Sequence, residues 1–165
     1  MSIVAISDDT FAVSAGGEEV RIWSRVEKPG ETAEQKSRQV WSVMAALNYR
    51  DLKVKQLVAN VHLRLSNVSS ALKKGASSAS LCLLHEGGWV SFWSHESWQL
   101  AYQFRLNRAD TKRVVFESSS RYLAALAENG SVEVWRLKGM DARYDWGLQF
   151  KSASHIEANT AIENQ

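Results

Sequence analysis

The sequence contains one cysteine, one proline and no long apolar run. The single thiol, Cys82, excludes an internal disulfide framework and is typical of a protein in a reducing compartment. No stretch approaches the roughly 18 apolar residues that a membrane-spanning helix needs, so we expect no membrane partner. Residues 1–10 also lack the basic and apolar regions of a signal peptide.

Residues that could carry out chemistry are few and scattered. The four histidines have no metal-ligand spacing, so we expect no metal site, no cofactor and no enzymatic activity. We expect His85 to form a surface hydrogen bond beside a turn, and Cys82 to be a small buried packing residue. The formal net charge of +2 predicts an ordinary mixed surface and is too small to argue for nucleic-acid binding.

Tryptophan is abundant, with seven copies, and three of them lie near the ends of windows that align without a gap. Each window has a short apolar run, a turn with glycine, and an alternating strand that leads to Trp. This pattern predicts a β-hairpin, because glycine and asparagine accept the positive φ of tight turns and alternating residues share one face of a strand. The windows are TFAVSAGGEEVRIWS (10–24), SLCLLHEGGWVSFWS (80–94) and YLAALAENGSVEVWR (122–136).

Equivalent positions of the three windows define a structural repeat. In the third window we expect a two-residue turn at Asn129-Gly130. We also expect the valines that begin the alternating strands to lie in the core: Val20, Val90 and Val132. The tryptophans and turn glycines of the repeat are Trp23, Trp93, Trp135, Gly17, Gly87 and Gly130.

The flanks of each window supply two further strands. We therefore predict three four-stranded antiparallel units in one domain, residues 1–150. The units cover about 1–45, 55–105 and 110–150, with long loops at 27–38 and 66–78 and a polar C-terminal segment at 151–165. Residues 54–65 also fit helical spacing, but the strict alternation at 61–65 favours a strand.

The repeat resembles the WD-repeat family in degenerate form. Trp93 and Trp135 lie 42 residues apart, within the spacing of such repeats. The Asp that follows the terminal Trp in that family is absent, because Ser24, Ser94 and Arg136 stand there, and no Gly-His pair occurs. The sequence therefore does not predict the polar network that those family residues build.

This resemblance implies an all-β fold that is part of a WD40-type β-propeller, with about three four-stranded blades. Propellers close with roughly four to eight blades, so three blades leave two open edges. We expect the chain to be a fragment of a larger propeller. The remaining blades come from the same polypeptide, which we favour, or from another chain.

Residues 40–150 carry a closer resemblance to the second propeller of the WD-repeat subunit of the UtpA (t-UTP) complex. That complex belongs to the small-subunit processome, which assembles on nascent pre-ribosomal RNA. The residues that carry the resemblance are the Trp41 strand followed by Asn48-Tyr49-Arg50, then Ser97-Trp98-Gln99-Leu100, then the Glu128-Asn129-Gly130 turn followed by Trp146.

The resemblance implies a non-enzymatic nucleolar scaffold that binds other UtpA subunits and pre-ribosomal RNA during 18S ribosomal RNA maturation. The alternative is a WD-repeat adaptor in another complex, such as a ubiquitin ligase, a trafficking complex or a chromatin complex, with a cytoplasmic location among the options. An enzyme built on a propeller ranks last, because no convergent titratable residues are visible.

Four further residues are candidates for contact with a partner. Trp89 and Trp98 flank the Trp of the second unit, and we expect each either to anchor a partner or to pack against the neighbouring sheet. Lys73 and Lys74 lie in a Ser-rich loop, where a solvated loop is favoured over contact with RNA phosphates.

Overall fold

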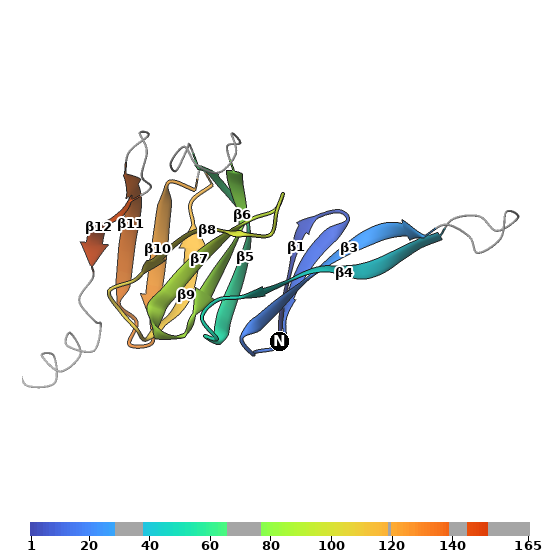
Figure 1. Cartoon of the computed structure of the whole chain (residues 1–165). Helices are drawn as coiled ribbons and strands as arrows, with labels where there is room; N and C mark the ends of the chain where they lie inside the picture. The colour runs from blue at the N-terminus through green and yellow to red at the C-terminus, as the bar shows by residue number, and fades with distance from the viewer. Residues whose placement is uncertain (29–37, 66–76, 119, 139–144, 152–165) are drawn as a thin grey trace, which may run out of the picture.

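The computed structural model describes residues 1–28, 38–65, 77–118, 120–138 and 145–151. Within this part of the chain the backbone forms three separate four-stranded antiparallel sheets, which lie side by side in a row (Figure 1). The one helical element among these residues is a single 3₁₀ turn. The all-β prediction, with about three four-stranded units, is therefore confirmed.

The first sheet contains β1 (Ser2–Ser7), β2 (Thr10–Ser14), β3 (Glu19–Lys28) and β4 (Arg38–Asn48), in that order across the sheet. β3 and β4 pair along their whole length and extend beyond β1 and β2 as a two-stranded ribbon (Figure 1). The ends of the loop expected at 27–38 are strand residues, because they continue this pairing. The rest of that loop lies outside the described residues.

The second sheet contains β5 (Val54–Leu65), β6 (Ser77–His85), β7 (Trp89–Ser94) and β8 (Leu100–Arg105). The strand prediction for 54–65 is confirmed over the helical alternative, because β5 pairs with β6 along most of its length. The loop expected at 66–78 is shorter at its C-terminal end, since residues 77–78 extend β6. The remainder of that loop lies outside the described residues.

The third sheet contains β9 (Thr111–Phe116), β10 (Tyr122–Ala127), β11 (Val132–Lys138) and β12 (Asp145–Lys151). Lys151 pairs with β11 and therefore belongs to the sheet rather than to the polar C-terminal segment. Residues 152–165 of that segment lie outside the described residues.

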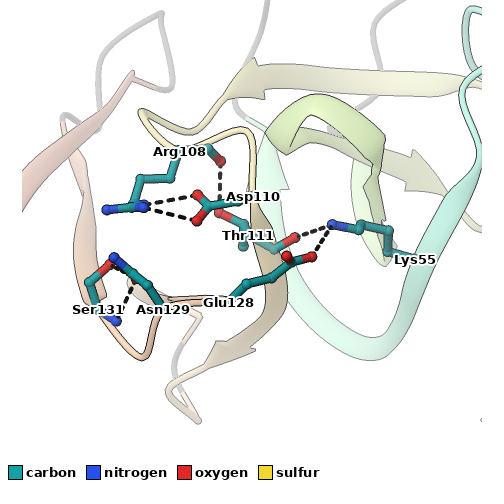
Figure 2. Close-up of polar contacts among 7 residues, drawn as sticks. All are labelled: Lys55, Arg108, Asp110, Thr111, Glu128, Asn129 and Ser131. Atoms are coloured by element: carbon teal, nitrogen blue, oxygen red, sulfur yellow. Dashed lines mark hydrogen bonds and ion pairs between the residues drawn. The ribbon is translucent and has the colours of Figure 1, made fainter. Parts of the chain in front are cut away.

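The hairpin turn of the third sheet has three residues, so the expected two-residue Asn-Gly turn is wrong. Gly130 N donates to Ala127 O at 3.1 Å, and Ala127 N donates to Ser131 O at 2.9 Å. Gly130 has a φ of 81°, whereas Asn129 is not in the left-handed region. Asn129 Oδ1 instead accepts bonds from the backbone N–H (3.0 Å) and the hydroxyl (2.7 Å) of Ser131 (Figure 2). A type I turn followed by a glycine in the left-handed region is the common form of a three-residue hairpin loop.

Two apolar cores lie between consecutive sheets. We call the face of a sheet that points to the next sheet along the chain its forward face, and the opposite face its rear face. The forward face of the first sheet packs on the rear face of the second, with Ala12 and Ile22 against Leu83 and Trp93. The second and third sheets repeat this arrangement through Cys82, Leu84, Phe92, Leu123, Ala125 and Trp135.

Within the described part of the chain, one face of each end sheet has no sheet packed on it, and we call this face bare. On the forward face of the third sheet, Val132 and Val134 are half-buried and Val115 is 52% exposed. On the rear face of the first sheet, Trp41 is 43% exposed and Ile3 is 62% exposed. The prediction that Val132 lies in the core is therefore wrong for this part of the chain, because no described sheet covers its face.

Candidate interaction surface

One end of the three sheets forms a continuous surface, which we call the turn face. It comprises the hairpin turns between the second and third strands of each sheet, together with the connections between sheets at residues 49–53 and 106–110. Four backbone hydrogen bonds tie turns to connections or to the start of a strand: Val54 N to Gly17 O (3.0 Å), Glu86 N to Lys53 O (2.9 Å), Leu106 N to Gly88 O (2.9 Å) and Glu128 N to Asp110 O (3.2 Å). The turn face is thus held by the backbone itself.

Polar side chains join the second and third sheets at the turn face (Figure 2). Arg108 donates two bonds to the carboxylate of Asp110, at 2.9 and 2.8 Å, and these bonds lower the pKa of Asp110. Lys55 Nζ donates to the carbonyl of Thr111 at 2.8 Å and lies 3.8 Å from the carboxylate of Glu128. Charges at this junction are therefore paired within the molecule.

The connection between the first and second sheets contains a strained turn. Arg50 and Asp51 have φ values of 54° and 52°, and Leu52 N donates to Tyr49 O at 3.1 Å. Two consecutive positive φ values in such a turn are typical of type I′, which costs non-glycine residues about 1–2 kcal/mol each. Asn48 stabilises the turn, because its side chain bonds the backbone N–H and the carboxylate of Asp51, each at 3.1 Å.

The strained turn places Arg50 against Trp89. The guanidinium carbon of Arg50 lies 4.7 Å from the centroid of the Trp89 ring and 5.3 Å from that of Tyr49. Arg105, at the end of β8, lies 5.9 Å from the same Trp89 centroid and donates through Nε to Gly87 O at 3.0 Å. Two exposed guanidinium groups therefore flank one half-buried indole ring.

The structure does not bring the two predicted anchors, Trp89 and Trp98, together. Trp89 begins β7 on the turn face, whereas Trp98 lies in the turn after β7, at the other end of the sheet. Both are half-buried and pack against the core between the first and second sheets, as the packing alternative expects. Contact of either residue with a partner stays a prediction.

The other predicted residues occupy different places. Lys73 and Lys74 lie outside the described residues. Trp93 and Trp135 are each 7% exposed between sheets, whereas Trp23 is half-buried on the bare rear face and stacks on Phe11 with centroids 6.3 Å apart. The glycines with positive φ in the three hairpin turns are Gly16, Gly87, Gly88 and Gly130. In the first turn the positive φ is therefore at Gly16 and not at Gly17, whose carbonyl accepts a hydrogen bond from Val54 N.

His85 belongs to a buried polar network, which corrects the expectation of a surface hydrogen bond. It is 0% exposed, and its Nε2 lies 2.7 Å from Ser91 Oγ. The indole N–H of Trp93 donates to the same Ser91 Oγ at 2.9 Å. Burial lowers the pKa of His85 to about 4, and the Leu52 backbone acts in the opposite direction. The middle sheet thus has a buried polar network of its own.

We expect this network to make stability depend on pH. An unfolded His titrates near 6.5, and His85 in the folded chain near 4. Between these values the unfolded chain binds the extra proton, so stability is lost as pH falls through this window. At about 1.4 kcal/mol per pKa unit, the full effect is at most about 3 kcal/mol.

Urea unfolding of the wild type and of His85→Gln, at about pH 7 and about pH 5, checks this expectation. The wild type should lose more unfolding free energy than the variant on acidification. Equal losses would show that His85 is not buried in its neutral form.

The hydrogen bond between Ser91 and Trp93 points to a further position of the repeat that the sequence could have identified. The residue two positions before the repeat Trp is polar in all three windows: Arg21, Ser91 and Glu133. Residues two apart share one face of a strand, so this side chain lies beside the indole. In the third sheet, Glu133 is 1% exposed and accepts a bond from Trp135 Nε1 at 3.3 Å. Arg21 faces the bare side and is exposed.

Chemistry beyond binding has little support in the described part of the chain. No group of three or more His, Cys, Asp or Glu residues gathers there in a way that would hold a metal ion. Cys82 is completely buried, and burial raises the pKa of its thiol, so it is a poor nucleophile. Among the same residues, no helix has the length and apolar character needed to cross a membrane.

The sequence matches no protein-family model and no curated protein. Its structure is similar to the crystal structure of the β-propeller domain of Cps50 (Swd1) from Myceliophteria thermophila, with a TM-score of 0.56 and 10% sequence identity. The match covers 91% of this chain and 43% of that one, so the chain spans less than half of its length. At this identity the likeness concerns the fold alone. The chain therefore has the fold of part of a β-propeller, and its three sheets are consecutive blades.

Proposed function

We propose that this chain is part of a non-enzymatic WD-repeat scaffold of the small-subunit processome, acting in the nucleolus during 18S ribosomal RNA maturation. Its partners on this proposal are other UtpA subunits and pre-ribosomal RNA. The β-propeller fold supports the scaffold class, since rigid sheets present loops and faces to other macromolecules.

The observation that carries the scaffold proposal is the pair of bare sheet faces. Both carry several apolar side chains, and each repeats a face that is covered elsewhere in the same molecule. Val134 of the third sheet corresponds to Phe92 of the second, which is 0% exposed, and Trp23 of the first corresponds to Trp93. Such faces mark contact sites, and we assign them to further blades from the same polypeptide or from another chain.

The processome part of the proposal rests on residues 40–150 and their resemblance to the UtpA subunit. In the structure, two of the resembling segments shape the turn face. Tyr49 and Arg50 form the first half of the strained turn and Asn48 stabilises it, and Glu128-Asn129-Gly130 is the hairpin loop of the third sheet. These segments therefore determine the shape of a surface, which supports a role in recognition.

Affinity purification of the protein that contains this segment tests the proposal, with mass spectrometry of the proteins and sequencing of the RNA. We expect UtpA subunits and 5′ pre-ribosomal RNA. A matched pair of variants adds a negative charge on the bare forward face (Val134→Glu) or at an exposed connection (Ser118→Glu). Only the first should disturb the covering blade: the blade is released if it belongs to another chain, and the propeller is destabilised if the blade belongs to the same polypeptide. Recovery of a ubiquitin ligase, trafficking or chromatin complex without pre-ribosomal RNA would overturn the processome assignment.

A further inference from the structure

We propose that Arg50, Trp89 and Arg105 form a docking site for carboxylate side chains of an acidic peptide segment. This inference rests on the proposed scaffold function and names the chemistry of one partner. Both guanidinium groups are exposed and both lie over the same ring, at 4.7 and 5.9 Å from its centroid. They therefore present N–H donors beside the same indole ring on the turn face.

The two arginines differ in pairing from Lys55 and Arg108, the cations at the junction of the second and third sheets. Lys55 and Arg108 are paired with Glu128 and Asp110. Within the described part of the chain, neither Arg50 nor Arg105 forms an ion pair. Arg105 uses Nε for a backbone carbonyl, which leaves its terminal nitrogens for another acceptor. Planar guanidinium groups bind carboxylates in a bidentate manner, so an external carboxylate completes this patch.

Backbone strain gives a second, independent reason to assign a role to Arg50. A non-glycine residue with a φ of 54° persists only where its surroundings hold it. Here the side chain of Asn48 holds the next residue, Asp51, through two hydrogen bonds. The molecule thus maintains an unfavourable turn whose result is the placement of Arg50 over Trp89.

The same geometry favours a peptide over a single-stranded nucleic acid. Bases bind by stacking on open aromatic faces, whereas the Trp89 ring is already covered by Arg50. Exposed carboxylates also lie on the turn face, including those of Glu18, Asp51 and Glu86. They would repel a continuous polyanion more than a peptide whose carboxylates are spaced apart.

Fluorescence anisotropy with a labelled peptide whose Glu residues are spaced apart tests the proposal, using the same peptide with Gln in place of Glu as the control ligand. We expect saturable binding of the Glu peptide only. Arg50→Gln and Arg105→Gln should each weaken binding about tenfold, as loss of a charge-assisted hydrogen bond does. Arg50→Lys should be intermediate. Arg38→Gln, which removes an exposed charge at the far end of β4, should have no effect.

A local readout separates site binding from general attraction. The indole N–H resonance of Trp89, assigned with Trp89→Phe, should shift on titration with the Glu peptide and stay unchanged with the Gln peptide. Equal affinity of wild type and Arg50→Gln, or no binding at all, would overturn the proposal. Tighter binding of an oligouridine, lost in Arg50→Gln, would overturn the choice of peptide. If the chain co-purifies with UtpA subunits but does not bind the Glu peptide, the docking site is refuted and the proposed function stands.

Discussion

Trp93→Ala should destabilise the 165-residue chain by about 3–5 kcal/mol, the usual cost of removing a large aromatic side chain from a core. Trp93 is 7% exposed in the core between the first and second sheets. Its loss also removes the hydrogen bond from the indole N–H to Ser91. Urea-induced unfolding followed by circular dichroism measures the effect.

Trp23→Ala is the matched control, because Trp23 occupies the same position of the repeat on the bare rear face. It is half-buried, and its ring stacks on Phe11 of the same sheet. We expect a loss of about 1 kcal/mol in the isolated chain, which is the size of one aromatic pair. Equal losses for the two variants would contradict the assignment of covered and bare faces.

Gly88→Ala should cost about 3 kcal/mol and is the second large effect. Gly88 has a φ of 75°, and a Cβ built on it would lie 2.4 Å from the carbonyl oxygen of Arg108. The left-handed conformation costs a residue with a side chain about 1–2 kcal/mol, and overpacking against backbone adds about 1–3 kcal/mol. The backbone cannot retreat easily, because Gly88 O accepts a bond from Leu106 N at 2.9 Å.

Gly16→Ala separates the two causes. Gly16 has a φ of 88°, but no atom lies within 4 Å of a Cβ built there. We expect about 1 kcal/mol from conformation alone. A melting temperature lowered equally in both variants would show that the close approach of Gly88 to Arg108 does not exist.

The strands and sheets were predictable because their causes are local. Alternation places Ile22 and Phe92 on one face, and glycine-rich turns mark the hairpins. Cys82 was also correctly identified as a packing residue, since it stands in the column of Ala12 and both are completely buried. These inferences need only the repeat and the geometry of a strand.

The features that could not be predicted from the sequence depend on neighbouring segments in space, which the repeat pattern does not specify. Val132 stands in the same column as Val20, yet it is only half-buried, because no described sheet packs on its face. The burial of His85 depends on Tyr49 from the preceding connection, whose ring lies 5.0 Å away. The left-handed turn at Arg50 contains no glycine that would have predicted it, and it depends on the side chain of Asn48.

We propose that this chain works as part of a scaffold whose bare sheet faces are covered by other blades. Hydroxyl-radical footprinting of the purified assembly, against the isolated 165-residue chain, tests it most directly. Trp41 reports on the rear face of the first sheet and Tyr122 on the forward face of the third, with exposed fractions of 43% and 40%. Both should be oxidised readily in the isolated chain and protected in the assembly as fully as Trp93. Oxidation of Trp41 and Tyr122 at the same rate in the two samples would contradict the account.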